Sequence, residues 1–184
     1  MATKKTSREE ILQKAIALFK KRGYSNTSIA NIAQQCGLIK GSLYHYFKSK
    51  DEIGLESLKY IHEYFDKNVY KIAYDDTLNS KDKIKLFVKK VDEYFLNSEG
   101  GCLLGNLALE VSNENEEFKK YIKKYFLAWE DALFNILKDK YTHEEARSLA
   151  REYVSLTQGA IMLMNLYEDN KDYLKVGQKI INLI

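Results

Sequence analysis

Residues 37–50 read GLIKGSLYHYFKSK, and they decide how the first part of this chain folds. Gly37 ends one short helix, and the spacing predicts a second short helix over roughly 40–46. Thr27 is a good N-cap for the earlier helix, whose apolar residues recur at helical spacing. Two short helices joined by a tight turn that contains glycine form a helix-turn-helix plan.

A longer helix is expected before this pair. Ser7 followed by Glu10 has the pattern of a capping box, and apolar residues then recur at helical spacing. Gly23 is placed to end the helix, because a glycine commonly follows the last helical residue. The sequence therefore predicts a supporting helix from about Arg8 to Arg22.

The remainder of the chain is predicted to be helical as well. The sequence has no proline, nine glycines and 45% hydrophobic residues, without a clear alternating strand pattern, so helix should dominate. Ser80, Asn113 and Thr142 are expected N-caps, the last two with a glutamate three residues later. A loop is expected at 97–101. The six further helices are expected at 51–74, from 80 up to that loop, and at 102–111, 113–138, 142–167 and 171–184. We predict an all-α fold of about nine helices, with a helix-turn-helix domain at 1–50 and a larger helical domain at 51–184.

Charge is distributed unevenly along the chain. The net charge of +3 combines +8 over residues 1–50 with −5 over residues 51–184. A strongly basic segment attracts polyanions, although a basic face can also be solvated without any partner. Charge therefore indicates nucleic acid but does not establish it.

The residue types after Gly37 suit the major groove of DNA. That groove is about 12 Å wide, so small residues are needed where the backbone approaches the duplex. Lys40, Gly41 and Ser42 provide a cation, a bare backbone and a short hydroxyl at the leading end of the second short helix. Lys48 is placed for a phosphate contact that orients the protein, and the backbone N–H groups at 27 and 28 are placed to hold a phosphate.

The stretch from Ile11 to Leu55 resembles the DNA-binding domain of the tetracycline-repressor (TetR) family. The shared features are the LF…RGY turn, the TSIxxIA second helix and the run GxxKGSLYHYFxSK. The resemblance implies a repressor that binds a palindromic operator in double-stranded DNA. It also implies that the remaining helices form a dimerising, ligand-binding body, in a homodimer that responds to an unidentified small-molecule effector.

The family pattern assigns one group of residues to the groove and another to the phosphate backbone. The groove-facing group is Lys40, Gly41, Ser42, Tyr44 and His45. The residues assigned to the phosphate backbone are Thr27, Tyr46 and Lys50. Ser28 and Lys48 join them because of their positions in the chain. Leu43 and Phe47 match core positions. Tyr44 could instead be a half-buried ring that packs against a neighbouring helix. His45 could instead be exposed without contacting DNA.

Two residues depart from the family pattern. Ile39 stands where a polar residue usually begins the recognition helix, which forfeits a side-chain cap worth about 0.5–2 kcal/mol. We expect local packing to compensate for the lost cap; the alternative is that Ile39 touches a thymine methyl group or a sugar edge. Cys36 replaces a common alanine and is expected to behave as a small hydrophobe, with redox sensing as the alternative.

The two closing helices are expected to form the dimer interface. A monomer offers a single recognition helix, whereas such regulators read pseudo-palindromes with two-fold symmetry. Gly159 and Ala160 permit close approach of a second helix, although packing within one subunit is the alternative. The apolar faces contain Ala146, Leu149, Ala150, Tyr153, Thr157, Ala160, Ile161, Met164, Tyr173, Leu174, Val176, Ile180 and Ile181.

Aromatic side chains of the central helices are candidates for an effector pocket. Such pockets are mostly apolar with a few polar groups, and each aromatic residue is equally suited to plain core. The candidates are Tyr60, Tyr64, Phe95, Asn106, Glu110, Phe126, Trp129 and Met162. Ligand would then favour a spacing of the recognition helices that no longer matches successive major grooves, about 34–36 Å apart. The alternative is a DNA-binding or scaffold protein whose larger domain senses nothing.

Other classes of function lack supporting motifs. The three histidines are isolated, and no HExxH motif, nucleophile elbow or phosphate-binding glycine loop occurs. Cys36 and Cys102 have no metal-site spacing. The N-terminus lacks an apolar signal segment, and no stretch approaches the roughly 20 apolar residues that span a bilayer. We predict a cytoplasmic protein that is not an enzyme, with no cofactor, no metal and no membrane contact.

Overall fold

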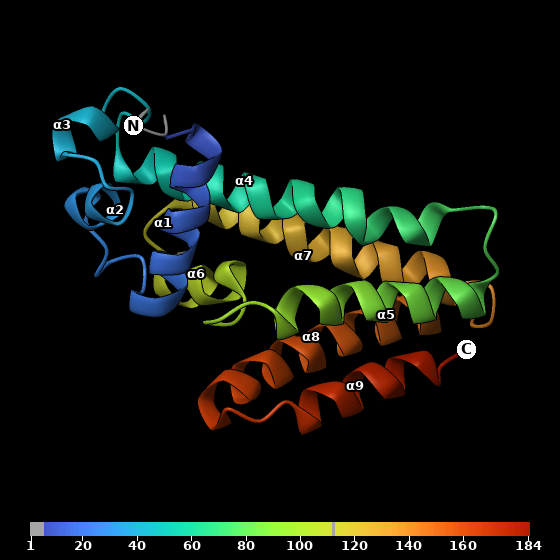
Figure 1. Cartoon of the computed structure of the whole chain (residues 1–184). Coiled ribbons are helices and arrows are strands. Elements are labelled where there is room, and N and C mark those ends of the chain that lie inside the picture. Colours follow the sequence, from blue (N-terminus) through green and yellow to red (C-terminus); the bar gives the residue numbers. More distant parts are fainter. Residues whose placement is uncertain (1–5, 112) are drawn as a thin grey trace, which may run out of the picture. The chain divides into compact units, whose positions relative to one another are not determined.

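The computed structural model describes residues 6–111 and 113–184. Within those ranges the chain forms nine α-helices and one 3-10 helix, without a β-strand (Figure 1). This confirms the predicted all-α class. The elements are α1 Arg8–Arg22, α2 Ile29–Gln35, α3 Lys40–Leu43, α4 Lys50–Asn68, η1 Tyr70–Tyr74, α5 Ser80–Leu96, α6 Leu103–Val111, α7 Glu116–Leu137, α8 His143–Tyr167 and α9 Lys171–Ile181.

The chain divides into two compact units by packing. The first unit contains the residues up to Ile61 together with Leu103–Ile122, and the second contains His62–Cys102 and Lys123–Ile184. The boundaries follow contacts and not function, so the division into a DNA-binding part at 1–50 and a larger part at 51–184 stays a prediction. In the described ranges, no helix is both long and apolar enough to cross a membrane.

Side-chain caps explain where several helices begin and end. The Ser7 hydroxyl accepts a hydrogen bond from the Glu10 N–H at 3.0 Å and opens α1. Gly23, with φ +83°, closes α1 and donates its N–H to the Phe19 carbonyl at 3.0 Å. The predicted capping box of Thr142 and Glu145 is present at the start of α8.

Three helices begin at a different cap from the one expected. The N-cap of α2 is Ser28, in a reciprocal capping box with Asn31. Asn79 caps α5, and the Asn115 side chain accepts from the Phe118 N–H at the start of α7. In each case a Ser or Asn side chain within two residues of the predicted cap is placed to accept an N–H of the first turn, which is what defines the cap.

Two helices are shorter than expected. The segment expected as one helix over 51–74 ends as α-helix at Asn68 and continues as η1, where the Ile72 N–H bonds the Val69 carbonyl three residues back. This tighter turn buries Tyr70, Ile72 and Ala73. The recognition helix, expected over 40–46, is α-helical only over α3, and turns follow it.

The core of the first unit leaves no room for a side chain at Gly54. A Cβ atom there would lie 2.6 Å from Cζ of Phe118 and 2.8 Å from Cε2 of Tyr24. The Tyr24 and Phe118 rings meet edge to face, with centroids 5.3 Å apart. Glycine therefore permits the close approach of α4 to these rings.

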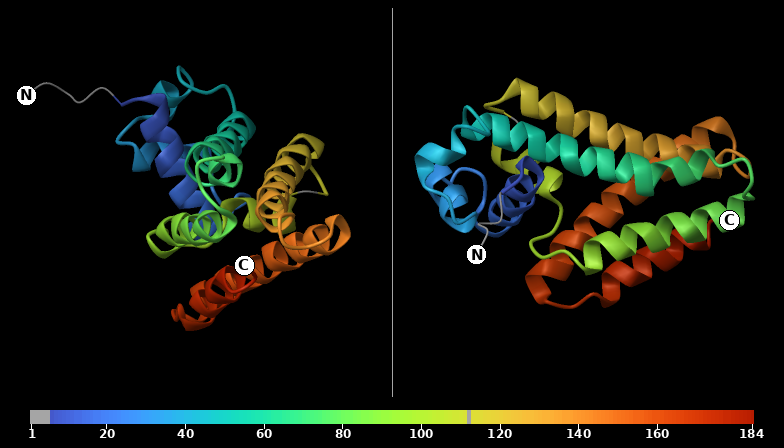
Figure 2. Two further views of the ribbon diagram at one scale, coloured as in Figure 1. Left: turned by 90° about the vertical axis from the view of Figure 1, so that its right-hand side faces the viewer. Right: turned by 45° about the horizontal axis from the view of Figure 1, so that its top comes forward.

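Aromatic rings fill the core of the second unit. The Phe95 and Trp129 rings are stacked at a centroid distance of 6.1 Å, and Phe65 packs against both of them. Helices α8 and α9 run side by side in both views of Figure 2, and α9 also packs on α5.

Much of the expected dimer face is buried inside the chain itself. Of the residues named for it, Ala146, Ala150, Thr157, Ala160, Ile161, Tyr173 and Ile180 are buried. The alternative of packing within one subunit therefore holds for these side chains. Leu174, which was also named for this face, is exposed, and so are four apolar residues of α8 that were not named: Leu156, Met162, Leu166 and Tyr167.

Candidate nucleic-acid interface

One face of the helix-turn-helix presents most of the residues predicted for the groove. Lys40, Gly41, Tyr44 and His45 are exposed, and Ser42 is half-buried. A Cβ atom on Gly41 would meet nothing within 4 Å, so the surface at this point is open to an approaching molecule. Lys48 is exposed as well, and its backbone N–H donates to a Glu52 carboxylate oxygen at 2.6 Å.

Buried residues hold this face in place. Leu43 and Phe47 are both buried, as the sequence predicts for core positions. The Arg8 guanidinium lies 4.1 Å from the centre of the Phe47 ring and donates to the Tyr46 carbonyl. It also pairs with the Glu52 carboxylate at 3.6 Å. Sequence reasoning missed Arg8 as a positioning residue, because nothing local to residue 8 indicates contacts nearly forty positions away.

Most of the residues predicted to contact the phosphate backbone make hydrogen bonds within the protein. Thr27 is buried; its hydroxyl donates to the Gly23 carbonyl at 2.7 Å and its N–H to the Tyr24 carbonyl at 3.1 Å. The Ser28 N–H donates to the Asn31 side chain at 2.9 Å. Both N–H groups therefore bond within the turn before α2, and a DNA contact by either residue stays a prediction.

Tyr46 and Lys50 also have partners inside the protein. The Tyr46 hydroxyl donates to the Thr6 carbonyl at 3.0 Å. The Lys50 ammonium donates to the Tyr24 carbonyl at 3.1 Å and lies 4.3 Å from the centre of that ring. These contacts tie the segment that follows α3 to the two ends of α1.

Tyr24 is a centre of contacts that the sequence analysis did not single out. Its ring is buried, and its hydroxyl donates to the Asp51 carboxylate at the start of α4. Burial, followed by the hydrogen bond and the negative charge of Asp51, raises the pKa of the Tyr24 phenol well above its ordinary value. The phenol is therefore a neutral hydrogen-bond donor that ties the end of α1 to α4.

Glu110, predicted as an effector contact, instead faces the turn between α1 and α2. Its carboxylate accepts hydrogen bonds from the Tyr24 N–H at 2.8 Å and from the Ser25 N–H at 2.6 Å. Burial alone would raise the pKa of Glu110, but these two N–H groups and the Lys50 charge hold it below its ordinary value. Glu110 therefore joins α6 to the helix-turn-helix.

The other predicted effector residues are divided between the two units. In the first unit, Tyr60 hydrogen-bonds Glu9 at 3.0 Å and Gln13 at 2.9 Å, and Asn106 is half-buried on α6. In the second unit, Phe95 and Trp129 are buried core. The rest are half-buried or exposed: Tyr64 packs on Tyr94, Phe126 packs on Tyr125, and Met162 is exposed.

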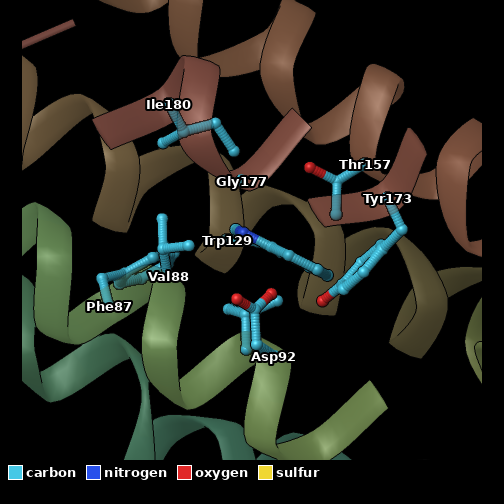
Figure 3. A pocket seen from close by; sticks show the side chains of 9 residues that line it. Phe87, Val88, Asp92, Trp129, Thr157, Tyr173, Gly177 and Ile180 are labelled. Carbon is cyan, nitrogen blue, oxygen red and sulfur yellow. The ribbon is translucent and has the colours of Figure 1, made fainter. Parts of the chain in front are cut away.

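Trp129 lines a small cavity of the second unit, shown in Figure 3. The free space is about 10 Å³, roughly what one water molecule needs. The Tyr173 hydroxyl is buried and makes no hydrogen bond of the usual distance and angle. Burial raises the pKa of the neighbouring Asp92 carboxyl. The lining residues are Phe87, Val88, Val91, Asp92, Trp129, Thr157, Tyr173, Gly177 and Ile180.

Ile39 is exposed at the leading end of α3, with 75% of its surface open to solvent. It occupies the N-cap position without any side-chain hydrogen bond. The Ile39 side chain itself provides little of the expected compensating packing, which comes instead from the buried Leu43 and Phe47. Cys36 is buried and unpaired, and burial raises the pKa of its thiol. Both observations agree with the expected role of Cys36 as a small hydrophobe.

Two family models match this chain. Residues 11–56 match the model "Bacterial regulatory proteins, tetR family". Residues 81–179, more than half of the chain, match the model "Transcriptional regulator LmrA/YxaF-like, C-terminal domain". The chain belongs to the TetR family. It is therefore a transcriptional regulator with a helix-turn-helix DNA-binding domain, and not an enzyme.

Individual relatives within the TetR family span the whole chain. The helix-turn-helix regulator YxaF of Bacillus subtilis (strain 168) is 31% identical over 98% of this chain and 96% of its own. LmrA of the same organism is 25% identical over 97% of this chain and 96% of its own. The crystal structure of a TetR transcriptional regulator from Legionella pneumophila covers all of both chains with a TM-score of 0.87 and 28% identity.

Proposed function

We propose that this protein is a homodimeric, cytoplasmic repressor that a small molecule releases from a palindromic operator. The observation that supports operator binding is the exposed surface of α3 and of the turn after it, where Lys40, Gly41, Tyr44 and His45 lie beside the buried anchors Leu43 and Phe47. A repressor role is supported by a relative, the transcriptional repressor DhaR of Mycobacterium sp. (strain GP1), which is 24% identical over 91% of this chain and 86% of its own.

The roles on the DNA follow from side-chain chemistry. Lys40 is a cation at the end of α3 that enters the groove, and Tyr44 and His45 offer polar groups at the ends of rigid rings. Lys48 binds a phosphate oxygen and fixes the register of the protein on the duplex. Ser42 stands on the same short helix as a hydroxyl donor and acceptor.

A second copy of this chain covers the exposed apolar residues of α8 and α9. Leu166 and Tyr167 leave 68% and 66% of their surfaces open, near the end of α8. A Cβ atom on Gly159 would meet nothing within 4 Å, so a partner helix can approach closely there. A surface groove brings together apolar residues of the two helices, and exposed apolar surface of this kind marks interaction sites. Its lining includes Leu156, Gly159, Ala160, Leu163 and Val176. The dimer brings together two recognition helices for the two halves of a palindrome.

The effector is proposed to bind in the second unit, around the cavity that Trp129 and Tyr173 line. An effector larger than a water molecule has to displace the walls of a space of about 10 Å³, so binding selects a more open form of the unit. The same small volume favours a second candidate function, a regulator whose larger part only dimerises. Release of bound operator by a small molecule distinguishes the two.

Titration of promoter DNA with variant proteins tests the interface. We expect Lys40→Ala and Tyr44→Ala each to weaken binding to a duplex from the protein's own promoter region by about 1–3 kcal/mol, as loss of a base contact does. Lys48→Ala should weaken binding to all sequences alike and lower the slope of log affinity against log salt by about 1. Fluorescence anisotropy at several salt concentrations measures both effects.

Lys138→Ala, an exposed lysine just beyond α7, is the matched control and should bind like the wild type. Unchanged affinity and specificity in both Lys40→Ala and Tyr44→Ala would contradict the assignment of this face to DNA.

A further inference from the structure

We propose that Ile39 reads the C5-methyl group of a thymine in the major groove, beside the leading end of α3. The inference rests on the proposed DNA-binding function and adds one base-specific contact to it. It gives a role to a residue that carries no hydrogen-bonding group in its side chain.

No role inside the protein accounts for Ile39. With 75% of its surface exposed, it contributes little to the core. It stands at the N-cap of α3 with extended backbone angles, φ −77° and ψ 153°, but caps no N–H with its side chain. A serine or threonine in this place would stabilise the helix by about 0.5–2 kcal/mol. The residue therefore gives up stability while presenting an apolar group to the outside.

The backbone holds Ile39 firmly in place. Its carbonyl accepts the Ser42 N–H at 3.0 Å, which closes the first turn of α3. The preceding Leu38 donates its N–H to the Ala33 carbonyl at 2.9 Å, which fixes the chain to the end of α2. A β-branched side chain also has few accessible χ1 rotamers. Ile39 is thus a rigid apolar projection, and little conformational entropy is lost when it makes a contact.

The surroundings of Ile39 point to a DNA base as its partner. Lys40 and Gly41 follow directly and are exposed, and the open space beside Gly41 allows a duplex to come close. Ile39 offers dispersion contact but no hydrogen bond. On the base edges of the major groove, the one apolar group is the C5-methyl of thymine. A thymine is therefore the base that an isoleucine here distinguishes from cytosine.

Thymine-to-deoxyuridine replacement isolates this contact, because it removes the methyl group and leaves base pairing intact. An operator is first selected from a pool of random duplexes with the wild-type protein. Each thymine is then replaced in turn by deoxyuridine, and the dissociation constants of wild type and Ile39→Ala are compared by fluorescence anisotropy. For the wild type we expect one symmetric pair of thymines whose replacement weakens binding about fourfold per half-site, as loss of one buried methyl group does.

In Ile39→Ala the same replacements should have no effect at that pair, while the other positions keep their wild-type profile. Leu109→Ala, another highly exposed apolar residue of the same unit at 88% exposure, is the matched control and should retain the full wild-type profile. Equal midpoints of thermal unfolding establish that Ile39→Ala is folded.

Equal deoxyuridine penalties in wild type and Ile39→Ala at every thymine would overturn the inference. So would loss of the same penalty in Leu109→Ala. A selection that enriches no duplex at all is a separate result, because it overturns the proposed DNA-binding function and the Ile39 contact together.

Discussion

At the level of single residues, Glu110 and Tyr24 determine how the turn between α1 and α2 is held. The Glu110 carboxylate satisfies the N–H groups of Tyr24 and Ser25, and the Tyr24 hydroxyl bonds Asp51. A Cβ atom on the adjacent Gly23 would lie only 3.3 Å from a Glu110 oxygen. The turn that precedes α2 is therefore built around one acidic side chain from a distant helix.

We expect Glu110→Gln to lower the free energy of unfolding by about 1 kcal/mol at neutral pH, since one N–H loses its acceptor oxygen. The pKa of Glu110 is lower in the folded protein than its ordinary value. Its stabilising effect is therefore present above the pKa of the unfolded chain and is lost as the pH falls through the folded pKa. Urea unfolding of wild type and variant over a pH series measures this difference.

Glu114→Gln is the matched control, because Glu114 is exposed just after α6. It should leave the free energy of unfolding unchanged at neutral pH. A Glu110→Gln protein as stable as the wild type at neutral pH would show that the N–H hydrogen bond lost in the variant contributes nothing to stability.

At the level of elements, α3 is too short to be stable alone. Four residues of α-helix make about one turn, which is marginal in water without tertiary packing. The burial of Leu43 and Phe47 and the stacking of Arg8 on the Phe47 ring supply that packing. The recognition surface is thus positioned by the core beneath it and by the first turn of α1.

The packing of α5 against α9 buries part of a carboxyl group, and this makes the stability of the second unit depend on pH. Burial raises the pKa of Asp92, so folding favours its protonated form. The free energy of unfolding should fall as the pH rises from the unfolded pKa through the folded pKa. Asp92→Asn removes this loss, and we expect the variant to be more stable than the wild type at neutral pH.

The advantage of Asp92→Asn should disappear at acidic pH, where the wild-type carboxyl is protonated in both folded and unfolded states. Thermal unfolding between pH 3 and pH 7 measures it. A variant that is less stable than the wild type at neutral pH would show instead that the ionised carboxylate is needed in the α5–α9 packing.

At the level of the whole molecule, local sequence patterns predicted the helices of the fold. They did not predict the contacts between residues that are far apart in the sequence. The caps at Ser7, Gly23 and Thr142 were predictable, because each bonds within three or four residues. The anchors Leu43 and Phe47 followed from the family resemblance. The contact of Glu110 with Ser25 joins positions 85 residues apart and depends on how α6 packs in the first unit. No local pattern encodes such a contact.

The same distinction explains the outcome for the candidate sites. Residue types and the family pattern selected a group that is mostly exposed, because the apolar Leu43 and Phe47, four positions apart, mark the buried side of this segment. They did not indicate that the N–H groups of Thr27 and Ser28 bond within the turn before α2. They also grouped Tyr60, Glu110 and Trp129 as one pocket, although an aromatic or acidic residue has no sequence signal that separates core, turn and cavity.

The central claim is that two copies of this chain read one palindromic operator through α3. Footprinting of the wild-type protein on its own promoter DNA, with the stoichiometry measured on the same fragment, tests it most directly. We predict two protected half-sites with centres one helical turn apart or a multiple of it, about 10 base pairs or a multiple of that, and an even number of chains per operator. Protection of a single half-site by one chain, or no protection at moderate salt, would contradict the account.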